Sequence, residues 1–509
     1  MKRWIGLTSK IISPFNRVEG DLDVEVKFKE NKVVDAKIVS RLFRGLELIL
    51  RGKSPLDSLV ITPRVCGICG ASHLYASASA LDMMFNAEVP RNAIRLRNVM
   101  SMAESCQNDL RHTYFMFLID VVNKKYQEYI NFEEVLKRFS PITGSSYKEC
   151  FRWSKKYTEV YAVFGGQWPH GSAIIPGGVT SYPLPNEVQK AISILIDIRK
   201  NYLENVVLGG PVEQFLNTVK SYKDLLQWVE DYKDGDLSRI VEFGLEANWH
   251  KLGHGTGIML SYGHLPFEEY VGSPSRKYFK PGIFFVKEKE YREFDQNNIL
   301  EFVTTSYYTY SKGDEIGLHP FEGETNPNIL DNSKKYSLTK CFRYKMDGNL
   351  LAPEVGALAM LTVSSNPLIL DIIDKIGPNV LSRVIARLVR VIIYNELMIN
   401  ELKDYEFGKP TYKKPTEVNE GKGFGLVEAP RGSLGHWIVV KNGKIFNYQM
   451  VTPTQINMGP EDPKGNKSHL SLALIGTEVS DINNPIEVYH IVRSHDPCMV
   501  CNVHMLKLI

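Results

Sequence analysis

The chain has little of what marks a secreted, membrane-spanning or nucleic-acid-binding protein. Its 509 residues contain seven cysteines, and an odd number in so long a chain argues against a disulfide framework. No run of about eighteen apolar residues occurs, so we expect no transmembrane helix. The basic start of the chain is followed by Gly6, Thr8 and Lys10 rather than an apolar stretch, so we expect no signal peptide. The net charge is only +3 and the lysines are interspersed with acids, so nothing points to nucleic acid.

What the chain does have is the composition of an ordinary globular protein, with 43% hydrophobic and 11% aromatic residues. Its length predicts one large subunit with closely packed lobes. We treat 1–509 as one unit. Its regions are 11–75 (hairpin and first cysteine pair), 91–210 (helical core), 378–403 (long core helix) and 425–509 (hairpin and second cysteine pair).

Apolar periodicity predicts an α+β fold that is mainly helical, with a central bundle of long helices and small sheets from both ends of the chain. Alternation in Leu22–Phe28 and a return over 33–39 predict one hairpin. Asn442-Gly443 predicts a second hairpin within 437–448. Helical spacing predicts helices over 91–130, 186–208 and 378–402, and composition predicts surface loops at 271–283 and 321–338.

Two Cys-x-x-Cys pairs, Cys66/Cys69 and Cys498/Cys501, lie near opposite ends of the chain. Four thiolates select zinc, copper(I), nickel or iron, so the pairs predict one shared metal site. A structural zinc site remains open on spacing alone, although zinc pairs usually lie within a few tens of residues. A redox-active dithiol would explain either pair but not both. The other cysteines at 106, 150 and 341 are expected to be buried apolar side chains.

The residues around both pairs resemble the large subunit of nickel–iron hydrogenases, and the matching segments follow the family's order along nearly the whole chain. The segments are Arg17-Val18-Glu19-Gly20, Phe43-Arg44-Gly45-Leu46-Glu47, Arg64-x-Cys66-Gly67-x-Cys69-x-x-x-His73, Gly165-Gly166-x-x-Pro169-His170, Glu354-Val355-Gly356, 428–437 from Glu428 to Trp437, Asn447-Tyr448-Gln449 with Pro453-Thr454, and Asp496-Pro497-Cys498-x-x-Cys501-x-x-His504.

The resemblance implies that Cys66, Cys69, Cys498 and Cys501 hold nickel. Cys69 and Cys501 would also bridge to an iron that carries carbon monoxide and cyanide ligands. Because cleavage of H₂ needs a base for the proton, the terminal thiolate of Cys498 would take it first and Glu19 next. Without the motif, Glu19 would be interpreted as an exposed carboxylate at a turn.

Further roles are implied around this centre. Arg431 would place its guanidinium over the open metal position, and Pro430 and Thr454 would line the pocket of the diatomic ligands. From the residues alone, Arg431 is equally typical of a surface ion pair and Thr454 of a turn hydroxyl. His73 would donate to a thiolate or be a packed core histidine, and it is not expected to bind metal.

The resemblance also implies a magnesium ion beneath the centre, held by Glu47, His504 and the backbone carbonyl of about Met450, with Asp496 in support. Some positions depart from the family pattern. Asn108-Asp109 replaces a usual His or Asp, Ala357 and Met360 replace a usual Pro and Arg, and a short tail 505–509 follows His504. The tail indicates either a precursor or a lineage that keeps it.

The resulting prediction is a hydrogenase catalytic subunit that interconverts H₂ with protons and electrons. No spare cysteine cluster has iron–sulfur spacing, so an iron–sulfur small subunit is implied as partner, with a membrane cytochrome or another electron-transfer subunit reached through it. The location is open, with membrane association expected only through partners. The alternatives are an H₂-sensing regulatory subunit with the same metals, a quinone-reductase-like subunit and a structural protein held together by zinc. The quinone-reductase class lacks the four cysteines that are present here.

Overall fold

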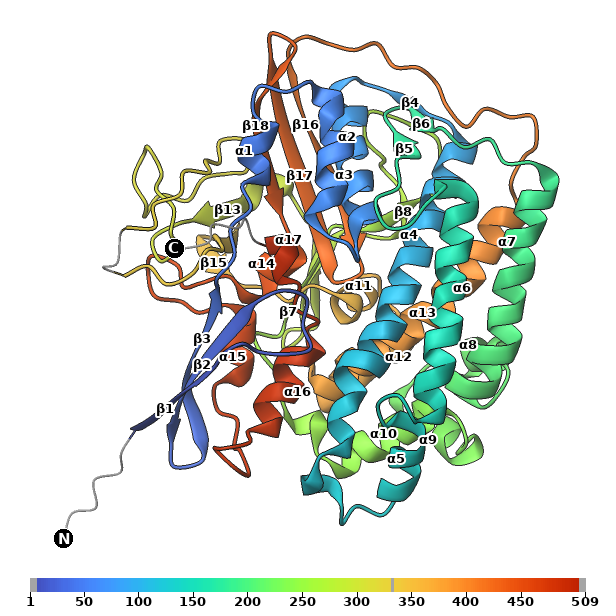
Figure 1. Cartoon of the computed structure of the whole chain (residues 1–509), viewed down its shortest axis with the longest axis vertical. Helices are drawn as coiled ribbons and strands as arrows, with labels where there is room; N and C mark the ends of the chain where they lie inside the picture. The colour runs from blue at the N-terminus through green and yellow to red at the C-terminus, as the bar shows by residue number, and fades with distance from the viewer. Residues whose placement is uncertain (1–6, 331–333, 503–509) are drawn as a thin grey trace.

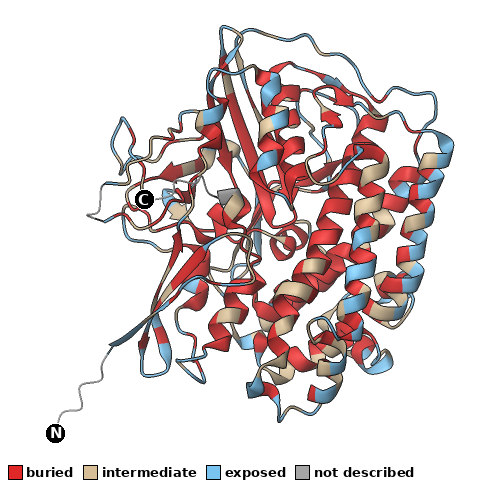
Figure 2. Ribbon diagram, in the orientation of Figure 1, coloured by how far each residue is buried: buried red, intermediate tan, exposed pale blue. Residues whose placement is uncertain are grey.

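The computed structural model describes residues 7–330 and 334–502, without the side chains of Cys501 and Asn502. Long helices fill one side of the molecule and small sheets the other (Figure 1). This confirms the predicted fold class. Buried residues run through both sides without a break between them (Figure 2). The division of the chain into the regions given above is not tested by this arrangement and stays a prediction.

Four helices form the core of the bundle: α4 (Arg91–Arg111), α6 (Ser145–Gly165), α7 (Pro185–Ile198) and α13 (Val380–Lys403). α13 packs against α4 and α7, and α6 packs against the same two helices. The predicted helices are therefore confirmed, and α6 is an addition. π-helical segments over 112–117 and 199–208 continue α4 and α7, so the first prediction extended a regular helix too far.

Three arginines lie along one face of α13, at a spacing of four and then three residues. Arg383 makes two hydrogen bonds to Glu354, at 2.6 and 2.9 Å, and Arg390 makes two to Asp109 on α4, at 2.8 and 2.7 Å. Arg387 donates to the carbonyl oxygen of Ser494 at 2.7 Å. All three side chains are buried. Helix α13, whose sequence is mainly apolar, thus connects three distant segments of the chain through its arginines.

The C-terminal sheet consists of β16 (Gly421–Ala429), β17 (Gly432–Lys441) and β18 (Lys444–Val451). Its second turn confirms the predicted type I′ signal, because Asn442 and Gly443 both have positive φ, 51° and 68°. β16 packs directly on α3 (Gly70–Met84). A Cβ on Gly425 would lie 1.9 Å from the carbonyl oxygen of Ala76, so only glycine permits this close approach.

The N-terminal sheet pairs β2 (Leu22–Lys29) with β3 (Lys32–Ser40), as predicted, and adds β1 (Leu7–Ile12) at its edge. The chain after β1 meets the C-terminal segment through a parallel bridge between Glu19 and Cys498. Segments almost the whole chain apart therefore lie side by side. Short elements precede α3: α1 (Leu46–Leu50), a 3₁₀ turn Pro55–Asp57, α2 (Ser58–Ile61) and a 3₁₀ turn Thr62–Val65.

The remaining elements surround this frame. The helices are α5 (Phe132–Phe139), α8 (Val212–Thr218), α9 (Tyr222–Asp231), α10 (Asp236–Glu246), α11 (Ala357–Val363), α12 (Pro367–Ile376), α14 (Pro453–Met458), α15 (His469–Leu474), α16 (Ile486–Ser494) and α17 (Met499–Asn502). The strands are β4 (Glu88–Val89), β5 (Ile174–Ile175), β6 (Gly178–Val179), β7 (Ile258–Ser261), β8 (His264–Pro266), β9 (Tyr270–Val271), β10 (Lys277–Phe279), β11 (Gly282–Phe285), β12 (Glu290–Arg292), β13 (Ile299–Phe302), β14 (Cys341–Met346) and β15 (Asn349–Leu351).

The predicted loop at 271–283 is wrong in part, because it contains β10 and the start of β11. Pairing with β8 and β7 supplies hydrogen bonds that a glycine- and proline-rich composition does not reveal. Within the described part of 321–338, the prediction of a loop is confirmed. Cys106, Cys150 and Cys341 are buried, as expected.

No single helix among the described residues has both the length and the apolar composition to cross a membrane. Helices α11 and α12 reach that length and composition only when taken together, and they are bent by 109° relative to each other.

Candidate metal centre

The first cysteine pair occupies the short loop between the 3₁₀ turn Thr62–Val65 and α3. The backbone N–H of Ile68 donates to Cys66 Sγ at 3.3 Å, and Cys69 is the N-cap residue immediately before α3. Both cysteines are buried while Gly67 between them is exposed. The loop therefore turns its sulfur atoms inward immediately beneath the surface.

The segment of Cys498 is held by two backbone hydrogen bonds to Glu19 and one hydrogen bond to a side-chain hydroxyl. Glu19 N–H donates to the Pro497 carbonyl at 3.2 Å, and Met499 N–H donates to the Glu19 carbonyl at 2.6 Å. Cys498 N–H donates to Thr454 Oγ1 at 3.0 Å. Thr454 belongs to the short helix α14, so an N-terminal turn and a C-terminal helix together fix the position of Cys498.

These two segments place three sulfur atoms in one buried group, which we call the thiolate cluster: Cys66, Cys69 and Cys498. Cys66 Sγ and Cys498 Sγ lie 3.6 Å apart, and all three sulfurs lie within 4.8 Å of one another. Sulfur ligands at about 2.3 Å from a tetrahedral metal lie roughly 3.8 Å apart, so the donor set and its spacing fit a metal. The side chain of Cys501, and His504 as a whole, lie outside the described residues.

Arg431 and Pro430 form the tight turn between β16 and β17, because Ala429 pairs with Gly432 across it. Gly432 has φ 122°, and a Cβ there would lie 2.5 Å from the backbone nitrogen of Gly356. The turn therefore packs closely against the backbone at Gly356. Since β16 lies along α3, this end of the hairpin reaches the thiolate cluster at the start of α3, where the cysteine charges act on Arg431.

Asp496 fixes the direction of the Arg431 side chain. Its Oδ1 lies 3.1 Å from Arg431 Nε, and Asn108 donates to its Oδ2 at 3.0 Å. Burial opposes ionisation of Asp496, but Arg431, His112, Arg387 and the Asn108 hydrogen bond together outweigh it and lower the pKa of Asp496 to about 2. Asn108 thus contributes a neutral donor at a position where the family pattern suggested a His or Asp.

Glu19 is half-buried beside Cys498. Burial raises the pKa of Glu19, the nearby Cys66 adds to this, and Arg431 acts in the opposite direction. A carboxylate in this position adjoins both the sulfur group and the protein surface. The carbonyl oxygen of Pro430 accepts a hydrogen bond from Arg390.

Glu47 and Met450 are joined by a hydrogen bond from Met450 N–H to Glu47 Oε1 at 2.9 Å, and Met450 belongs to the same buried apolar group as the three cysteines. The hydroxyl of Thr325 donates to the other oxygen of Glu47. Lys340 Nζ lies 3.6 Å from Glu47 and 3.7 Å from Glu301. Two buried carboxylates here share one lysine.

Several residues near the cluster were not singled out from the sequence. Glu104 on α4 accepts N–H groups from Ala71 and Ser72 at 2.9 Å each and so holds the first turn of α3. His73 pairs with His436, which pairs with Tyr448. His436 and Tyr448 lie inside recognised segments, which was the available signal. Glu104 has no such signal, because an acid within a helix is ordinarily solvated.

A second group of potential ligands, the imidazole cluster, consists of Glu354, His469 and His495. His469 Nε2 lies 3.1 Å from His495 Nε2 and 3.2 Å from Glu354 Oε2. Both oxygens of Glu354, however, already accept hydrogen bonds from Arg383, whose Nη2 also lies 3.4 Å from His469 Nε2. A cation of the protein therefore stands among these ligands.

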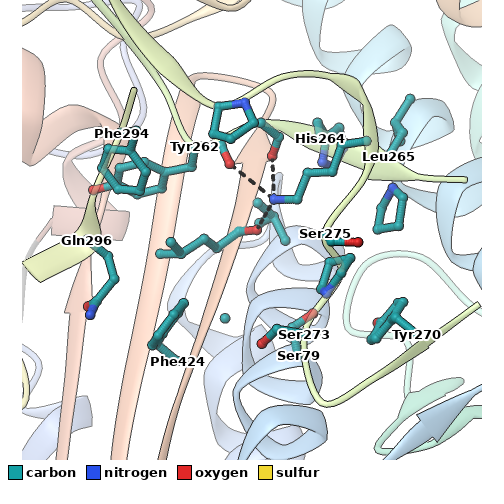
Figure 3. Close-up of a pocket in the computed structure, with 18 of the residues that line it drawn as sticks. Ser79, Tyr262, His264, Leu265, Tyr270, Ser273, Ser275, Phe294, Gln296 and Phe424 are labelled. Atoms are coloured by element: carbon teal, nitrogen blue, oxygen red, sulfur yellow. Dashed lines mark hydrogen bonds between the residues drawn. The ribbon is translucent and has the colours of Figure 1, made fainter. Parts of the chain in front are cut away.

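A cavity of about 330 Å³ lies against another part of α3, and the residues that line it include none of the cysteines (Figure 3). Its half-buried Lys277 donates to the carbonyl oxygens of Tyr262 and Gly263 at 3.1 Å and of Leu426 at 3.4 Å. Burial lowers the pKa of Lys277 to about 8. Because its hydrogen bonds join the β7–β8 turn to β16, we interpret Lys277 as a structural cation and place the chemistry at the thiolate cluster.

Comparison with known proteins points the same way. The sequence profile of the nickel-dependent hydrogenases matches residues 44–143 and 140–504. The chain is 31% identical to the periplasmic [NiFeSe] hydrogenase large subunit of Desulfomicrobium baculatum, over 97% of this chain and 94% of that one. It is 27% identical to the uptake hydrogenase large subunit of Rhizobium leguminosarum, over 98% and 95%. The Ni-Fe-Se hydrogenase structure from D. vulgaris Hildenborough superimposes with a TM-score of 0.81 at 29% identity, covering 98% of this chain and 100% of that one.

Proposed function

The chain belongs to the nickel-dependent hydrogenase family, and on that premise we propose which of its residues hold the metals and move the proton. It is the large subunit of an oxidoreductase that interconverts H₂ with two protons and two electrons. One observation carries the proposal. Cys66 and Cys498, 432 positions apart, bring their sulfurs to 3.6 Å in a buried site.

We propose that Cys66, Cys69, Cys498 and Cys501 would hold nickel, and that Cys69 and Cys501 would also hold an iron with carbon monoxide and cyanide ligands. The family profile supports nickel over zinc, which the sulfur geometry fits equally well. The name of the D. baculatum relative includes selenium. All four positions here are cysteine, so the donors in this chain are sulfur.

When bound, the metals supply Lewis-acid and redox chemistry that polarises H₂ and accepts its electrons. The chain supplies the base. We propose that Cys498 Sγ takes the proton and that the Glu19 carboxylate receives it next. Support comes from the backbone pairing of Glu19 with the Cys498 segment and from the Cys66 charge that acts on Glu19. Half-burial lets Glu19 serve both the cluster and the surface.

Arg431 acts as a fixed positive charge rather than as a base. A guanidinium remains protonated in proteins, and Asp496 holds it 3.1 Å away in a buried ion pair. Preorganised charge in a site without water stabilises developing negative charge at no reorganisation cost. We therefore propose that Arg431 polarises H₂ at the open metal position.

Thr454 has two roles in this proposal. Its oxygen accepts the N–H of Cys498 at 3.0 Å, and its own hydroxyl proton remains to donate to a cyanide. Pro430, in the turn beside Arg431, lines the same pocket with apolar ring atoms. An apolar surface with one hydrogen-bond donor suits small diatomic ligands, because each of them has few acceptor atoms.

We propose a magnesium ion at Glu47, the carbonyl of Met450 and His504. Support comes from charge: Glu47 and Glu301 face a single ammonium, Lys340. One negative charge of this group is left uncompensated, and a hard divalent cation with oxygen ligands would offset it. His504, outside the described residues, is assigned on the family pattern alone.

An iron–sulfur small subunit is the proposed partner. Among the described residues, no further cysteine belongs to a group with metal-ligand spacing, so the electrons need a path in another chain. The loop that holds Cys66 and Cys69 reaches the surface at Gly67, and exposed apolar side chains lie nearby at Ile49, Leu56 and Val60. An apolar patch beside the metals suits a stable partner. A membrane cytochrome would be reached through that partner.

Infrared spectroscopy with metal quantitation tests the assignment on the protein purified with its natural partner. We expect bands of metal-bound carbon monoxide and cyanide, with about one nickel per chain. A variant Cys66→Ser should lose both, and Cys106→Ser should keep both, because Cys106 lies in another buried apolar group and is not one of the clustered ligands. Zinc without such bands in the parent protein would contradict the proposal.

A further inference from the structure

The first turn of α3, which follows Cys69 directly, is capped by a carboxylate from another helix. Cys69 is the N-cap residue of α3, and its carbonyl oxygen accepts the N–H of His73 at 3.3 Å. The side chain of an N-cap residue ordinarily accepts the N–H of the second or third residue of its helix. Here these two N–H groups, of Ala71 and Ser72, donate instead to Glu104 on α4, at 2.9 Å each.

The carboxylate of Glu104 accepts four hydrogen bonds and lies almost wholly inside the protein, with 1% of the residue exposed. Its Oε1 accepts the N–H of Ala71 and, at 3.3 Å, the indole N–H of Trp168. Its Oε2 accepts both the N–H and the hydroxyl of Ser72, the latter at 2.6 Å. Hydrogen bonds to a charged acceptor are about twice as strong as those between neutral groups. The first turn of α3 is therefore fixed firmly to α4.

This cap bears on Cys69, because the N-terminus of a helix attracts a nearby anion. A thiolate at such a position is stabilised by the N–H groups of the first turn. Hydrogen bonds to a metal thiolate also withdraw electron density from the metals, as outer partners of metal ligands do. Cys69 is one of the two cysteines proposed above to hold both metals. The two N–H groups that an N-cap side chain would reach are already bound by Glu104.

We propose that Glu104 is a positioning residue, which binds the first-turn N–H groups of α3 and so withholds them from the Cys69 sulfur. The proposal rests on the metal centre assigned above. Glu104→Gln keeps the shape of the side chain but replaces one acceptor oxygen with an NH₂ group that faces donors. One N–H of the first turn then loses its acceptor and turns to the sulfur. The metals lose electron density, so the carbon monoxide and cyanide bands move to higher wavenumber.

The first test compares Glu104→Gln with Asp371→Asn in the complex with the natural partner. Asp371 is a matched control, because it lies on α12 and its carboxylate accepts the N–H of Tyr222, the first residue of α9, at 2.7 Å. Neither of these helices carries a residue of the thiolate cluster. Burial raises the pKa of Glu104 to about 7 although its donors oppose the shift. The bands are therefore compared at about pH 9, where the parent carboxylate is ionised.

We expect the bands to move to higher wavenumber, and H₂ turnover to slow by up to about tenfold, in Glu104→Gln only. Unchanged bands in Glu104→Gln at parental nickel content, or equal shifts in both variants, would overturn this inference alone. Absence of bands in the parent protein would instead overturn the metal centre, and this inference with it.

Residue-resolved hydrogen exchange tests the cap itself and needs no variant to fold. In the parent complex, the N–H groups of Ala71 and Ser72 should exchange slowly, and fast exchange would overturn the proposal. In Glu104→Gln, at least one of them should exchange roughly tenfold faster, because a hydrogen bond to a charged group is lost. A band shift without faster exchange would mean that the charge of Glu104 acts directly on the metals, and the capping role would be wrong.

Discussion

Two buried groups of side chains offer three potential metal ligands each. The thiolate cluster joins the two ends of the chain through backbone hydrogen bonds, and the nearby cation, Arg431, is paired with Asp496. The imidazole cluster has its cation within it, since Arg383 binds both oxygens of Glu354. Convergence of ligand types is therefore insufficient evidence for a metal. The two groups differ in whether a cation of the protein already lies among the ligands, as Arg383 does in the imidazole cluster.

The largest expected effect comes from breaking the thiolate cluster. Cys498→Ser should abolish nickel binding and H₂ turnover, a loss beyond the roughly 10–100-fold caused by removing an outer partner of a ligand. His469→Gln should retain nickel and most activity, because the imidazole cluster holds Arg383 instead. Nickel content and H₂ uptake measure both. Loss of nickel from His469→Gln at unchanged stability would mean that the second group also serves a metal.

Removal of Glu354 should mainly affect stability. Glu354→Ala leaves Arg383 buried without its carboxylate, which costs about 3–5 kcal/mol. Arg383→Met should cost a similar amount, and the double variant should cost less than the sum, because no unpaired charge remains. Denaturant unfolding of the complex gives the three values. Strict additivity would contradict the ion pair, and protection of the parent protein by added zinc would favour a metal there.

Lys277 extends the comparison to a half-buried cation whose three hydrogen bonds go to neutral carbonyls. Its pKa is about 8 in the folded protein against 10.5 for the free group. Between these values the unfolded chain binds more protons, so the free energy of unfolding rises with pH, by up to roughly 3 kcal/mol. The nearby Glu428 carboxylate limits the shift.

Lys277→Met should lack this rise, so the stability difference between parent and variant should change between about pH 8 and pH 10.5. Unfolding midpoints across that range test it. Other groups that titrate there cancel in the difference. Parallel curves for the two proteins would show that the ammonium of Lys277 is as well solvated when folded as when unfolded.

The sequence revealed the thiolate cluster more fully than the imidazole cluster, for a physical reason. Cys-x-x-Cys fixes the spacing of two sulfurs locally, so the motif carries the geometry. Glu354, His469 and His495 lie on separate elements, and only folding brings them together. The long helices and both hairpins were likewise predictable, because periodicity and the Asn442-Gly443 turn act over a few residues. β10 depended on partners elsewhere in the chain and was missed.

The smallest expected effect returns to the thiolate cluster and concerns one hydrogen bond. Thr454→Val leaves the buried N–H of Cys498 without its acceptor, which costs about 1–3 kcal/mol, whereas Thr454→Ser keeps the oxygen. Valine should therefore lower the unfolding midpoint and speed the loss of nickel to a chelator, and serine should do neither to the same extent. This contrast would show that Cys498 is held by neutral hydrogen bonds, each weaker than the ion pair of the imidazole cluster. Equal behaviour of valine and serine would mean that the Thr454 methyl group, rather than its oxygen, keeps the second chain end in place.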